Sequence, residues 1–320
     1  MKKIKKLKII LPIVIIFLVG VYFFIGNYFY NFALNANQKK DFLDGNPHLA
    51  VSKTVDNELI EKNKMEDATF THNHTANTIK ISSADQLKLS ARLYENKQTS
   101  HHWAIVVHGY SGNNTQMIRY IRHFHENGYN VLAPDLRGHG ESEGKYIGMG
   151  WDDRKDMLLW INQIIEKDPD AEIALFGVSM GGATVMMTSG EKLPKNVKVI
   201  VEDCGYSSVI EEFTYQLDDL FHLPKFPFIN AANTITKIRA GYDLNDADAV
   251  KQVAKSKTPI LFIHGDNDSF VPYKMLNKVY HAAKVEKDKL IIRGAGHGEA
   301  EKVNPELYWS TLWKFVDQYI

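Results

Sequence analysis

Residues 173–182 combine a serine with closely spaced glycines. They read Ile-Ala-Leu-Phe-Gly-Val-Ser-Met-Gly-Gly, so Ser179 stands in a G-x-S-x-G pentapeptide between an apolar run and a helix-like segment. Glycines on both sides permit a tight turn in which the serine takes a strained backbone conformation. Such a turn presents the hydroxyl at the end of a sheet, beside a backbone N–H and a helix N-terminus. The pattern predicts that Ser179 is a nucleophile; the alternative is a glycine-rich turn without chemistry.

Further polar clusters stand directly after other short apolar runs, at 108–112, 134–142, 202–205, 264–268 and 293–297. From about residue 77 onward, such runs alternate with helix-like segments. This alternation is typical of a mostly parallel sheet with helices on both faces, an α/β fold. Ligands of such sheets bind beyond the C-terminal ends of the strands, where all these clusters are expected to lie.

The elements that must position these clusters follow from the apolar periodicity. Residues 78–82 and 87–94 alternate with period two, which predicts an antiparallel pair. Buried strands are expected at 103–107, 129–133, 173–176, 197–201, 259–263 and 289–292, and helices at 116–127, 151–167 and 306–319. Residues 206–256 contain no clear strand and are rich in aromatics, so we interpret them as a small helical cap over the strand ends. The alternative is that they are ordinary helices packed on the sheet.

Composition excludes several classes of function. The chain has 320 residues, with 38 Lys+Arg and 38 Asp+Glu, so its formal charge gives no attraction to nucleic acid. Its 44% apolar content is enough for a sizeable core. Cys204 is its only cysteine, so an intrachain disulfide is ruled out. We expect Cys204 to be a buried small apolar side chain.

The N-terminus has the pattern of a membrane anchor. Met1–Lys8 is basic, Ile9–Tyr28 is strongly apolar, and no charged side chain occurs from Ile9 to Gln38. A membrane-spanning helix needs about 20 such residues, and lysines favour the cytoplasmic side. We therefore expect residues 1–34 to form a single-pass anchor in the cell membrane, with the catalytic domain extracytoplasmic. A cleaved signal peptide and a secreted protein are the alternative. Tyrosines 22, 28 and 30 are expected at the outer interface.

Residues 35–76 are polar, charged and rich in turn formers, and they allow a helix over Val55–Met65. We interpret them as a stalk that leads to a catalytic domain at 77–320. The paired histidines His72/His74 and His101/His102 lack a carboxylate or cysteine at matching spacing, so they are expected to be solvated. No metal or organic cofactor is expected.

Taken together, the motifs resemble those of the α/β-hydrolase fold. The chain is similar to bacterial single-domain esterases and serine aminopeptidase-like proteins, a group that includes monoacylglycerol lipases and cinnamoyl esterases. The resemblance covers the chain from about residue 77 to its end. The matching stretches are 108–112 (His-Gly-Tyr-Ser-Gly), 135–142 (Asp-Leu-Arg-Gly-His-Gly-Glu-Ser), 177–182, 264–272 (His-Gly-Asp-Asn-Asp-Ser-Phe-Val-Pro) and 296–297 (Gly-His).

This resemblance implies a catalytic triad in the chain order Ser, Asp, His. It aligns Asp268 with the family's acid and makes His297, between two glycines, the best candidate base for Ser179. Asp266 and Asp203 remain alternatives for the acid. The competing histidines are His264, which is expected to brace its loop, and His108 and His139, which precede the serine and so fit the wrong order.

Acyl transfer also needs two backbone N–H groups that stabilise an oxyanion. The resemblance implies the N–H groups of Tyr110 and Met180 for this role. Asp135, Arg137 and His139 are interpreted as a network that braces a loop.

The leading hypothesis is a membrane-anchored serine hydrolase, a carboxylesterase for small or medium acyl esters. An alternative is a serine peptidase or aminopeptidase acting on short peptides, which would need an acidic pocket for the substrate terminus. Acidic residues that could supply one are Glu202, Glu211, Glu212, Asp218 and Asp219. A non-enzymatic cell-surface binding module is a further alternative, although such proteins usually lose a triad residue, and here all three are present.

Overall fold

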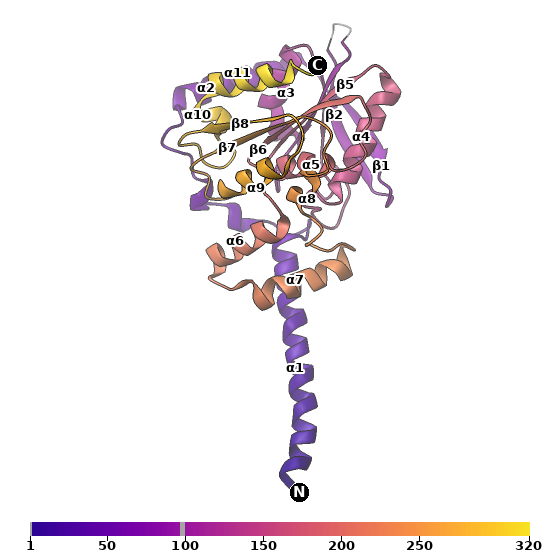
Figure 1. Ribbon diagram of the computed structural model, residues 1–320, viewed down its shortest axis with the longest axis vertical. Coiled ribbons are helices and arrows are strands. Elements are labelled where there is room, and N and C mark those ends of the chain that lie inside the picture. Colours follow the sequence, from indigo (N-terminus) through magenta and orange to yellow (C-terminus); the bar gives the residue numbers. More distant parts are fainter. Residues whose placement is uncertain (1, 97–99) are drawn as a thin grey trace.

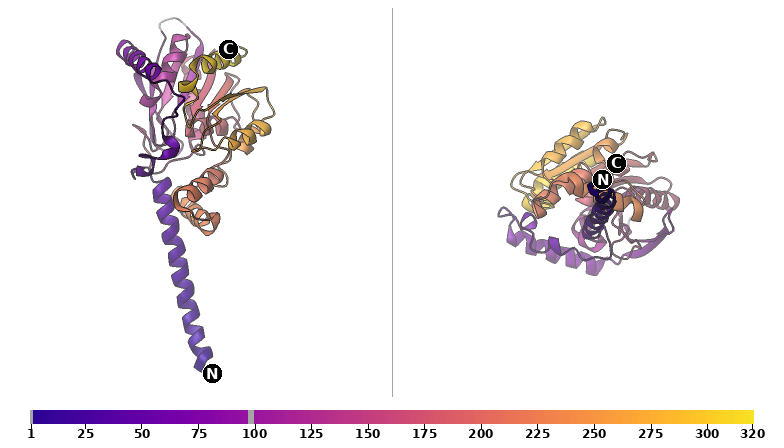
Figure 2. Two further views of the ribbon diagram at one scale, coloured as in Figure 1. Left: turned by 90° about the vertical axis from the view of Figure 1, so that its left-hand side faces the viewer. Right: turned by 90° about the horizontal axis from the view of Figure 1, so that it is seen from below.

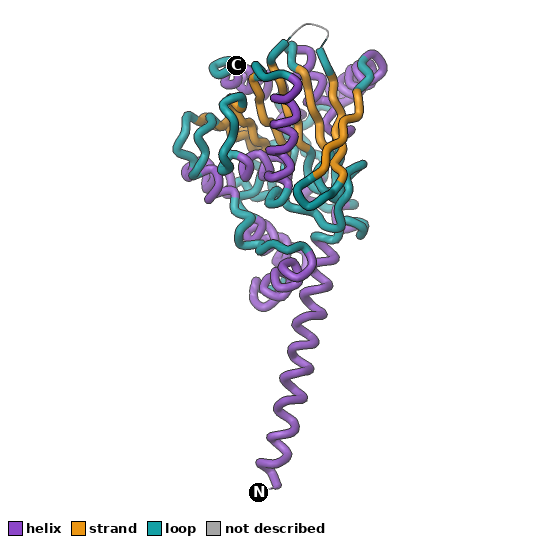
Figure 3. Tube along the Cα trace, turned by 90° about the vertical axis from the view of Figure 1, so that its right-hand side faces the viewer, coloured by secondary structure: helices purple, strands orange, loops and turns teal. Residues whose placement is uncertain are grey.

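The computed structural model describes residues 2–96 and 100–320. One long helix, α1 (Lys2–Ala33), projects from a sheet domain, with its N-terminal end far from the sheet (Figures 1 and 3). Its segment Ile10–Ala33 contains an 18-residue stretch with a mean hydropathy of 2.4 and is long and apolar enough to cross a membrane. Large apolar side chains between Ile10 and Phe24 are exposed along it.

The domain is built on an eight-stranded sheet in the order β1-β2-β4-β3-β5-β6-β7-β8. Strand β2 runs antiparallel to β1 and β4, and the other neighbouring strands are parallel, which confirms the predicted mostly parallel sheet. The strands are β1 (Asn77–Ser82), β2 (Lys88–Tyr94), β3 (His102–Val107), β4 (Asn130–Pro134), β5 (Glu172–Val178), β6 (Val197–Asp203), β7 (Ile260–Gly265) and β8 (Lys287–Ile292).

Helices cover both faces of this sheet, as the alternation of apolar runs and helix-like segments predicts. Apolar side chains of α4, α5, α8 and α9 pack on one face, and those of α2, α3 and α11 pack on the other (Figure 1). The helices are α2 (Asn57–Asn73), α3 (Ile118–Glu126), α4 (Asp153–Lys167), α5 (Met180–Thr188), α6 (Val209–Phe221), α7 (Lys225–Arg239), α8 (Ala249–Val253), α9 (Lys274–Ala282), α10 (Ala300–Val303) and α11 (Pro305–Val316).

The central strands bring the functional loops together. Strands β3 and β5 are buried on both faces over most of their length, which explains why their sequences are continuous apolar runs rather than alternating ones. Their parallel register pairs Val107 with Gly177. The loop after β3 therefore emerges directly beside the turn that contains Ser179.

The segment between β6 and β7 forms helices α6, α7 and α8, as expected for residues 206–256. Helices α6 and α7 stand away from the sheet beside the C-terminal part of α1, the part nearest the sheet domain (Figures 1 and 2). The contact with α7 is close: a Cβ added at Gly26 would overlap the Ala231 backbone. Glycine at this position lets the two helices approach.

The expected interfacial position of Tyr30 is wrong. Its ring is 2% exposed, with the Arg239 guanidinium 4.2 Å from the ring centre. The Tyr22 hydroxyl bonds to Thr234 of α7 over 3.0 Å, whereas Tyr28 is exposed. Aromatic residues on an apolar helix suit a protein contact as well as a bilayer interface, so composition alone does not separate the two.

The segment that follows α1 lies against the catalytic domain. Short 3-10 turns at Asp41–Leu43 and Pro47–Leu49 lead to α2, which extends well beyond the predicted Val55–Met65. Asp67 of α2 accepts hydrogen bonds from Arg119 and Arg122 of α3 over 3.0 and 2.9 Å. This partly buried pairing holds α2 on the domain.

Candidate active site

Ser179 occupies the sharp turn between β5 and α5. Its backbone has φ 58° and ψ −119°, a conformation that costs a non-glycine residue free energy and is often found at functional sites. A Cβ at Gly177 would overlap the Gly181 backbone, and one at Gly181 would overlap Val107 of β3. Glycines flank the serine because strand, turn and helix pack too closely for side chains.

The structure brings Ser179, His297 and Asp268 into one hydrogen-bonded chain. His297 Nε2 lies 2.8 Å from Ser179 Oγ, and His297 Nδ1 lies 2.7 Å from Asp268 Oδ2. The three side chains come from the turns after β5, β7 and β8, which end at the same edge of the sheet. With Nδ1–H donating to the carboxylate, Nε2 is free to accept the serine proton.

The residues that compete for the acid role lie elsewhere. Asp266 accepts the Gly294 N–H over 2.6 Å and thereby joins two loops. Asp203 is buried and accepts the Tyr308 hydroxyl over 2.8 Å. Asp268 accepts the Phe270 and Val271 N–H groups through Oδ1, over 3.0 and 2.8 Å, which directs Oδ2 toward His297.

The other histidines considered for the role of base form contacts that hold loops in place. Buried His264 lies 3.0 Å from the Val271 carbonyl oxygen and 3.2 Å from Asp268 Oδ2, so it supports the acid loop as expected. His108 Nε2 accepts the Leu136 N–H over 3.0 Å, and His139 Nε2 accepts the Ser111 N–H over 3.2 Å. Burial lowers the pKa of His108 to about 4 and that of His139 to about 3, so both rings are neutral at pH 7.

The charged groups around His297 make its imidazole a better base. Burial alone would lower its pKa, but the charge and hydrogen bond of Asp268, aided by Glu212 and Asp203, raise it above the ordinary 6.5. Burial likewise opposes ionisation of Asp268. The charge of His297 and hydrogen bonds from His264 and His297 nevertheless hold the pKa of Asp268 well below its usual range. An anionic Asp268 therefore stands behind the imidazole.

Two backbone N–H groups lie beside the serine. Met180 follows it at the start of α5, and Tyr110 follows Gly109, whose own added Cβ would lie 3.3 Å from the Ser179 Cβ. Within residues 2–96 and 100–320, neither N–H donates to a protein acceptor. Both donors are therefore available to an oxyanion on a group that Ser179 attacks.

An apolar cavity of about 70 Å³ opens onto Ser179. Its walls come from several elements: Phe213 and Leu220 of α6, Phe270 from the acid loop, Tyr110 and Met149, and Phe32, Ala33 and Phe42 from the N-terminal segment. One carboxyl group, Glu212, lies in this wall; it is 5% exposed, and only its Oε1 has a partner, Gln216. Burial raises the pKa of Glu212 to about 8.

Comparisons with known proteins show what this chain is similar to. A family model described as serine aminopeptidase, S33, matches residues 98–202. The uncharacterized protein YqkD of Bacillus subtilis is 27% identical over 214 residues, which cover 67% of this chain and 70% of YqkD. The esterase Pf2001 of Pyrococcus furiosus superposes with a TM-score of 0.62 and 23% identity, covering 77% of this chain and 92% of the esterase. The chain has the α/β-hydrolase fold.

Another solved structure is similar to this chain in fold. The acylaminoacyl peptidase of Pyrococcus horikoshii superposes with a TM-score of 0.57 and 16% identity, covering 75% of this chain and 41% of the peptidase. The matched family segment contains Ser179 and the loop after β3 but ends before Asp268 and His297. Those two residues are assigned from the geometry above.

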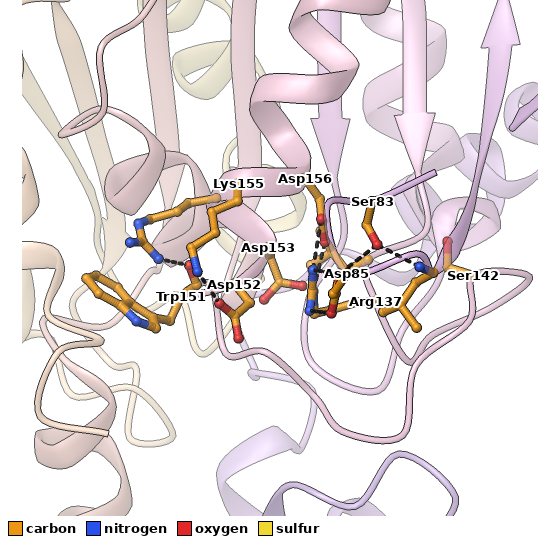
Figure 4. A network of polar contacts seen from close by, with 12 residues as sticks. Ser83, Asp85, Arg137, Ser142, Trp151, Asp152, Asp153, Lys155 and Asp156 are labelled. Carbon is orange, nitrogen blue, oxygen red and sulfur yellow. Dashed lines mark hydrogen bonds and ion pairs between the residues drawn. The ribbon is translucent and has the colours of Figure 1, made fainter. Parts of the chain in front are cut away.

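The loop after β4 is braced as expected. Arg137 donates to both carboxylate oxygens of Asp156 over 2.8 and 2.9 Å, and to Asp85 over 3.0 and 3.2 Å (Figure 4). Asp135 accepts the N–H groups of Asn114 and Glu141, both over 2.8 Å. These bonds tie the loop after β4 to the start of α4 and to the loop after β3, which contains Tyr110.

The sequence analysis did not identify a second brace, between the N-terminal segment and the loop of His297. Glu299 is buried and accepts the Gly296 N–H over 3.2 Å, and it forms a short hydrogen bond with the Ser52 hydroxyl. Thr54 donates to the Gly294 carbonyl over 3.0 Å. The only local signal is a glutamate two residues after His297, and its partner lies 247 positions away in sequence.

Potential metal ligands also meet at this site. Over the described part of the chain, the one group close enough to share an ion is Cys204, Asp268 and His297. Asp268 and His297 already pair with each other, and burial raises the pKa of the Cys204 thiol well above its usual range. Protonated and buried, Cys204 has the apolar role expected for it.

The paired histidines lie elsewhere. His74 stacks on Phe70 with ring centres 4.4 Å apart, and His101 lies 2.8 Å from Asp168.

Proposed function

We propose that this hydrolase is a membrane-anchored carboxylesterase that cleaves small or medium acyl esters through Ser179, His297 and Asp268. The observation that carries the proposal is the continuous hydrogen-bonded chain from Asp268 through His297 to Ser179, at the base of an apolar cavity. An apolar cavity with few polar groups suits an acyl chain.

The geometry supports a two-step reaction. Ser179 Oγ attacks the ester carbonyl carbon while His297 Nε2 takes the hydroxyl proton, and the Tyr110 and Met180 N–H groups bind the resulting oxyanion. The tetrahedral intermediate expels the alcohol, which receives the proton from His297, and an acyl-serine remains. Water then gives a proton to His297 and attacks the acyl carbon. Release of the carboxylic acid returns the proton to Ser179 Oγ.

A fluorophosphonate probe tests the nucleophile. The serine oxygen of an activated serine bonds to phosphorus and displaces fluoride, so wild-type protein is expected to be labelled. Ser179→Ala should abolish both labelling and hydrolysis of p-nitrophenyl butyrate, whereas Ser189→Ala, in a buried serine at the other end of α5, should preserve both. Continued labelling of Ser179→Ala would refute the assignment.

The proposed topology places residues 1–8 inside the cell, the apolar part of α1 in the membrane and the catalytic domain outside. The lysine cluster before α1's apolar segment and the exposed apolar side chains of that segment support it. The sole cysteine is buried, so an introduced cysteine is a specific reporter. On intact cells, a membrane-impermeant maleimide should label exposed Lys80→Cys but not Lys3→Cys; the reverse pattern would contradict this topology.

Glu212 favours a second candidate, a peptidase for short peptides with a free amino terminus. Of the acidic residues considered for this role, Glu212 lines the Ser179 cavity, whereas Glu202 accepts the Gly205 N–H and Glu211 pairs with Lys278 on the surface. With a pKa of about 8, Glu212 would release its proton on binding an ammonium group, which its unpartnered Oε2 could accept as a hydrogen-bond donor. If so, Glu212→Gln should reduce kcat/KM for aminoacyl anilides at least tenfold and leave that for p-nitrophenyl butyrate within about threefold. Wild-type protein that cleaves only esters would exclude this candidate.

A further inference from the structure

The C-terminal end of α1 takes part in the site as well as in the proposed anchor. Phe32 and Ala33, the last residues of α1, line the same cavity as Ser179. The Tyr110 hydroxyl, in the loop that supplies a proposed oxyanion donor, donates to the Ala33 carbonyl over 2.6 Å. The helix end is thus in contact with both the cavity and the loop beside the nucleophile.

A second apolar cavity, of about 50 Å³, lies on the other side of this helix end. It is bounded by Phe29 of α1 and by Leu34 directly after it, by Leu217 of α6 and by Ile229 of α7. Phe32 and Ala33 line both cavities, together with Phe213, Gln216 and Leu220 of α6. These side chains therefore form the partition between the space at Ser179 and the second cavity.

The helix end is held rigidly enough to act as a partition. The buried ammonium group of Lys40 donates to the carbonyls of Asn31, Phe32 and Asn35 over 3.3, 2.9 and 3.0 Å. The Phe32 ring packs against Phe42 and Phe221, with ring centres 4.5 and 5.2 Å away. A side chain fixed in this way limits the length of a ligand that enters from Ser179.

We propose that Phe32 and Ala33 of α1 are specificity-determining residues that close the acyl pocket and set the length of the acyl chain that the hydrolase accepts. This inference rests on the proposed esterase function. The substrate class is an ester with a linear, unbranched apolar acyl chain that extends from Ser179 toward α1. Each further methylene that the pocket buries should raise kcat/KM roughly fourfold. In a series of esters of increasing acyl length, the increase should therefore stop at the length where the chain reaches the partition.

The test uses the full-length protein in detergent micelles and measures labelling rates with fluorophosphonates that carry alkyl chains of two or ten carbons. Phe32→Ala joins the two cavities, so the ratio of long-chain to short-chain rates should rise at least fivefold. Ala33→Leu narrows the first cavity and should lower that ratio at least fivefold. The matched control is Phe24→Ala, on the same helix but 73% exposed, which should leave the ratio within twofold of wild type.

The outcomes separate this inference from the proposed function. If wild-type protein reacts with the short probe but all three variants keep the wild-type ratio, the inference is overturned and the serine hydrolase assignment stands. If no probe labels wild-type protein and it hydrolyses no p-nitrophenyl ester, the proposed function itself fails. Should Phe32→Ala not fold, Phe32→Leu should still raise the ratio, and the opposite shift from Ala33→Leu remains decisive.

Discussion

At the scale of single residues, burial at the site favours neutral side chains, and a few neighbouring charges oppose that effect. Burial favours the neutral forms of Asp268 and His297, yet each stabilises the charged form of the other across a 2.7 Å hydrogen bond. Glu212 has no cationic partner of that kind in hydrogen-bond contact, and its pKa rises to about 8. Neighbouring carboxyl groups thus differ in ionisation at neutral pH because their partners differ.

The pKa of His297 predicts the acid limb of the pH profile. His297 must be neutral to accept the serine proton, and Asp268 raises its pKa, so kcat/KM should increase with pH with a midpoint above 6.5. Asp268→Asn should move this midpoint to lower pH and reduce kcat on the order of 10⁴-fold. Asp266→Asn, which alters an acid that does not contact His297, should leave the midpoint unchanged. An unshifted midpoint in Asp268→Asn would contradict the electrostatic role of that residue.

Glu212 makes a second residue-scale prediction, on stability. Its folded-state pKa of about 8 exceeds the ordinary 4.5, so the folded protein binds this proton more tightly than the unfolded chain. Its contribution to the free energy of unfolding is therefore complete below about pH 4.5 and is lost as the pH rises through 8. Glu212→Gln should raise Tm at pH 8.5 relative to wild type and have a smaller effect at pH 5, measured by thermal unfolding.

The adjacent Glu211 provides a control of opposite sign. Burial raises its pKa, but bonds from Lys278 and Ser207 outweigh this and lower it below the ordinary value. Its contribution is present above pH 4.5 and is lost as the pH falls through the lowered pKa. Glu211→Gln should therefore reduce Tm at pH 8.5. Equal shifts for the two variants would show that the difference in environment has no energetic effect.

At the scale of elements, the backbone groups at the ends of helices and loops need hydrogen-bond partners. The residues that supply these partners hold the elements around the site in place. The C-terminal carbonyls of α1 would be unpaired where the chain leaves the helix, and Lys40 supplies the donors from the following turn. The loop of His297 is likewise held by Ser52 and Glu299. Segments outside the sheet thus fix the elements that the reaction uses.

Lys40 provides an element-scale prediction. Burial lowers the pKa of Lys40 to about 8, and the residue is 9% exposed. Lys40→Met should remove the donor of the Asn31 and Phe32 carbonyls, while the Asn35 carbonyl keeps the Gln38 N–H, and should destabilise the protein by about 1–3 kcal/mol, as measured by denaturant unfolding. The matched control is Lys39→Met, because Lys39 is 81% exposed and pairs only with surface carboxylates. Similar losses in the two variants would argue against the capping role.

At the scale of the whole molecule, α1 has an exposed part and a buried part. The part from Ile10 to Phe24 exposes its apolar side chains, whereas Tyr30, and Leu34 directly after the helix, are buried. The exposed part suits a bilayer and supports the proposed anchor. The buried part joins the sheet domain, the cap and the cavity.

Two truncations test this division of α1. A chain that starts at residue 22 keeps the contacts of Gly26, Tyr30 and Phe32, so it should retain kcat/KM within about threefold of the full-length protein in detergent. A chain that starts at residue 35 loses them and exposes the apolar faces of α6 and α7, so its Tm should fall by several degrees and its kcat/KM by tenfold or more. Equal activity of the two fragments would show that α1 acts only as an anchor.

The sequence by itself determined the order and the type of the elements and the identity of the residues that meet at the site. It could do so because the signals are local: the glycines around Ser179 are required by a tight turn, and polar clusters after parallel strands must share one edge of the sheet. The tertiary structure decided which carboxylate faces His297, since Asp266 and Asp268 differ only in the direction their loop gives them.

The tertiary structure also decided that the end of α1 belongs to the cavity and that Ser52 braces Glu299. In both cases the partners lie far apart in sequence, and apolar periodicity is the same for a side chain that faces lipid and for one that faces protein.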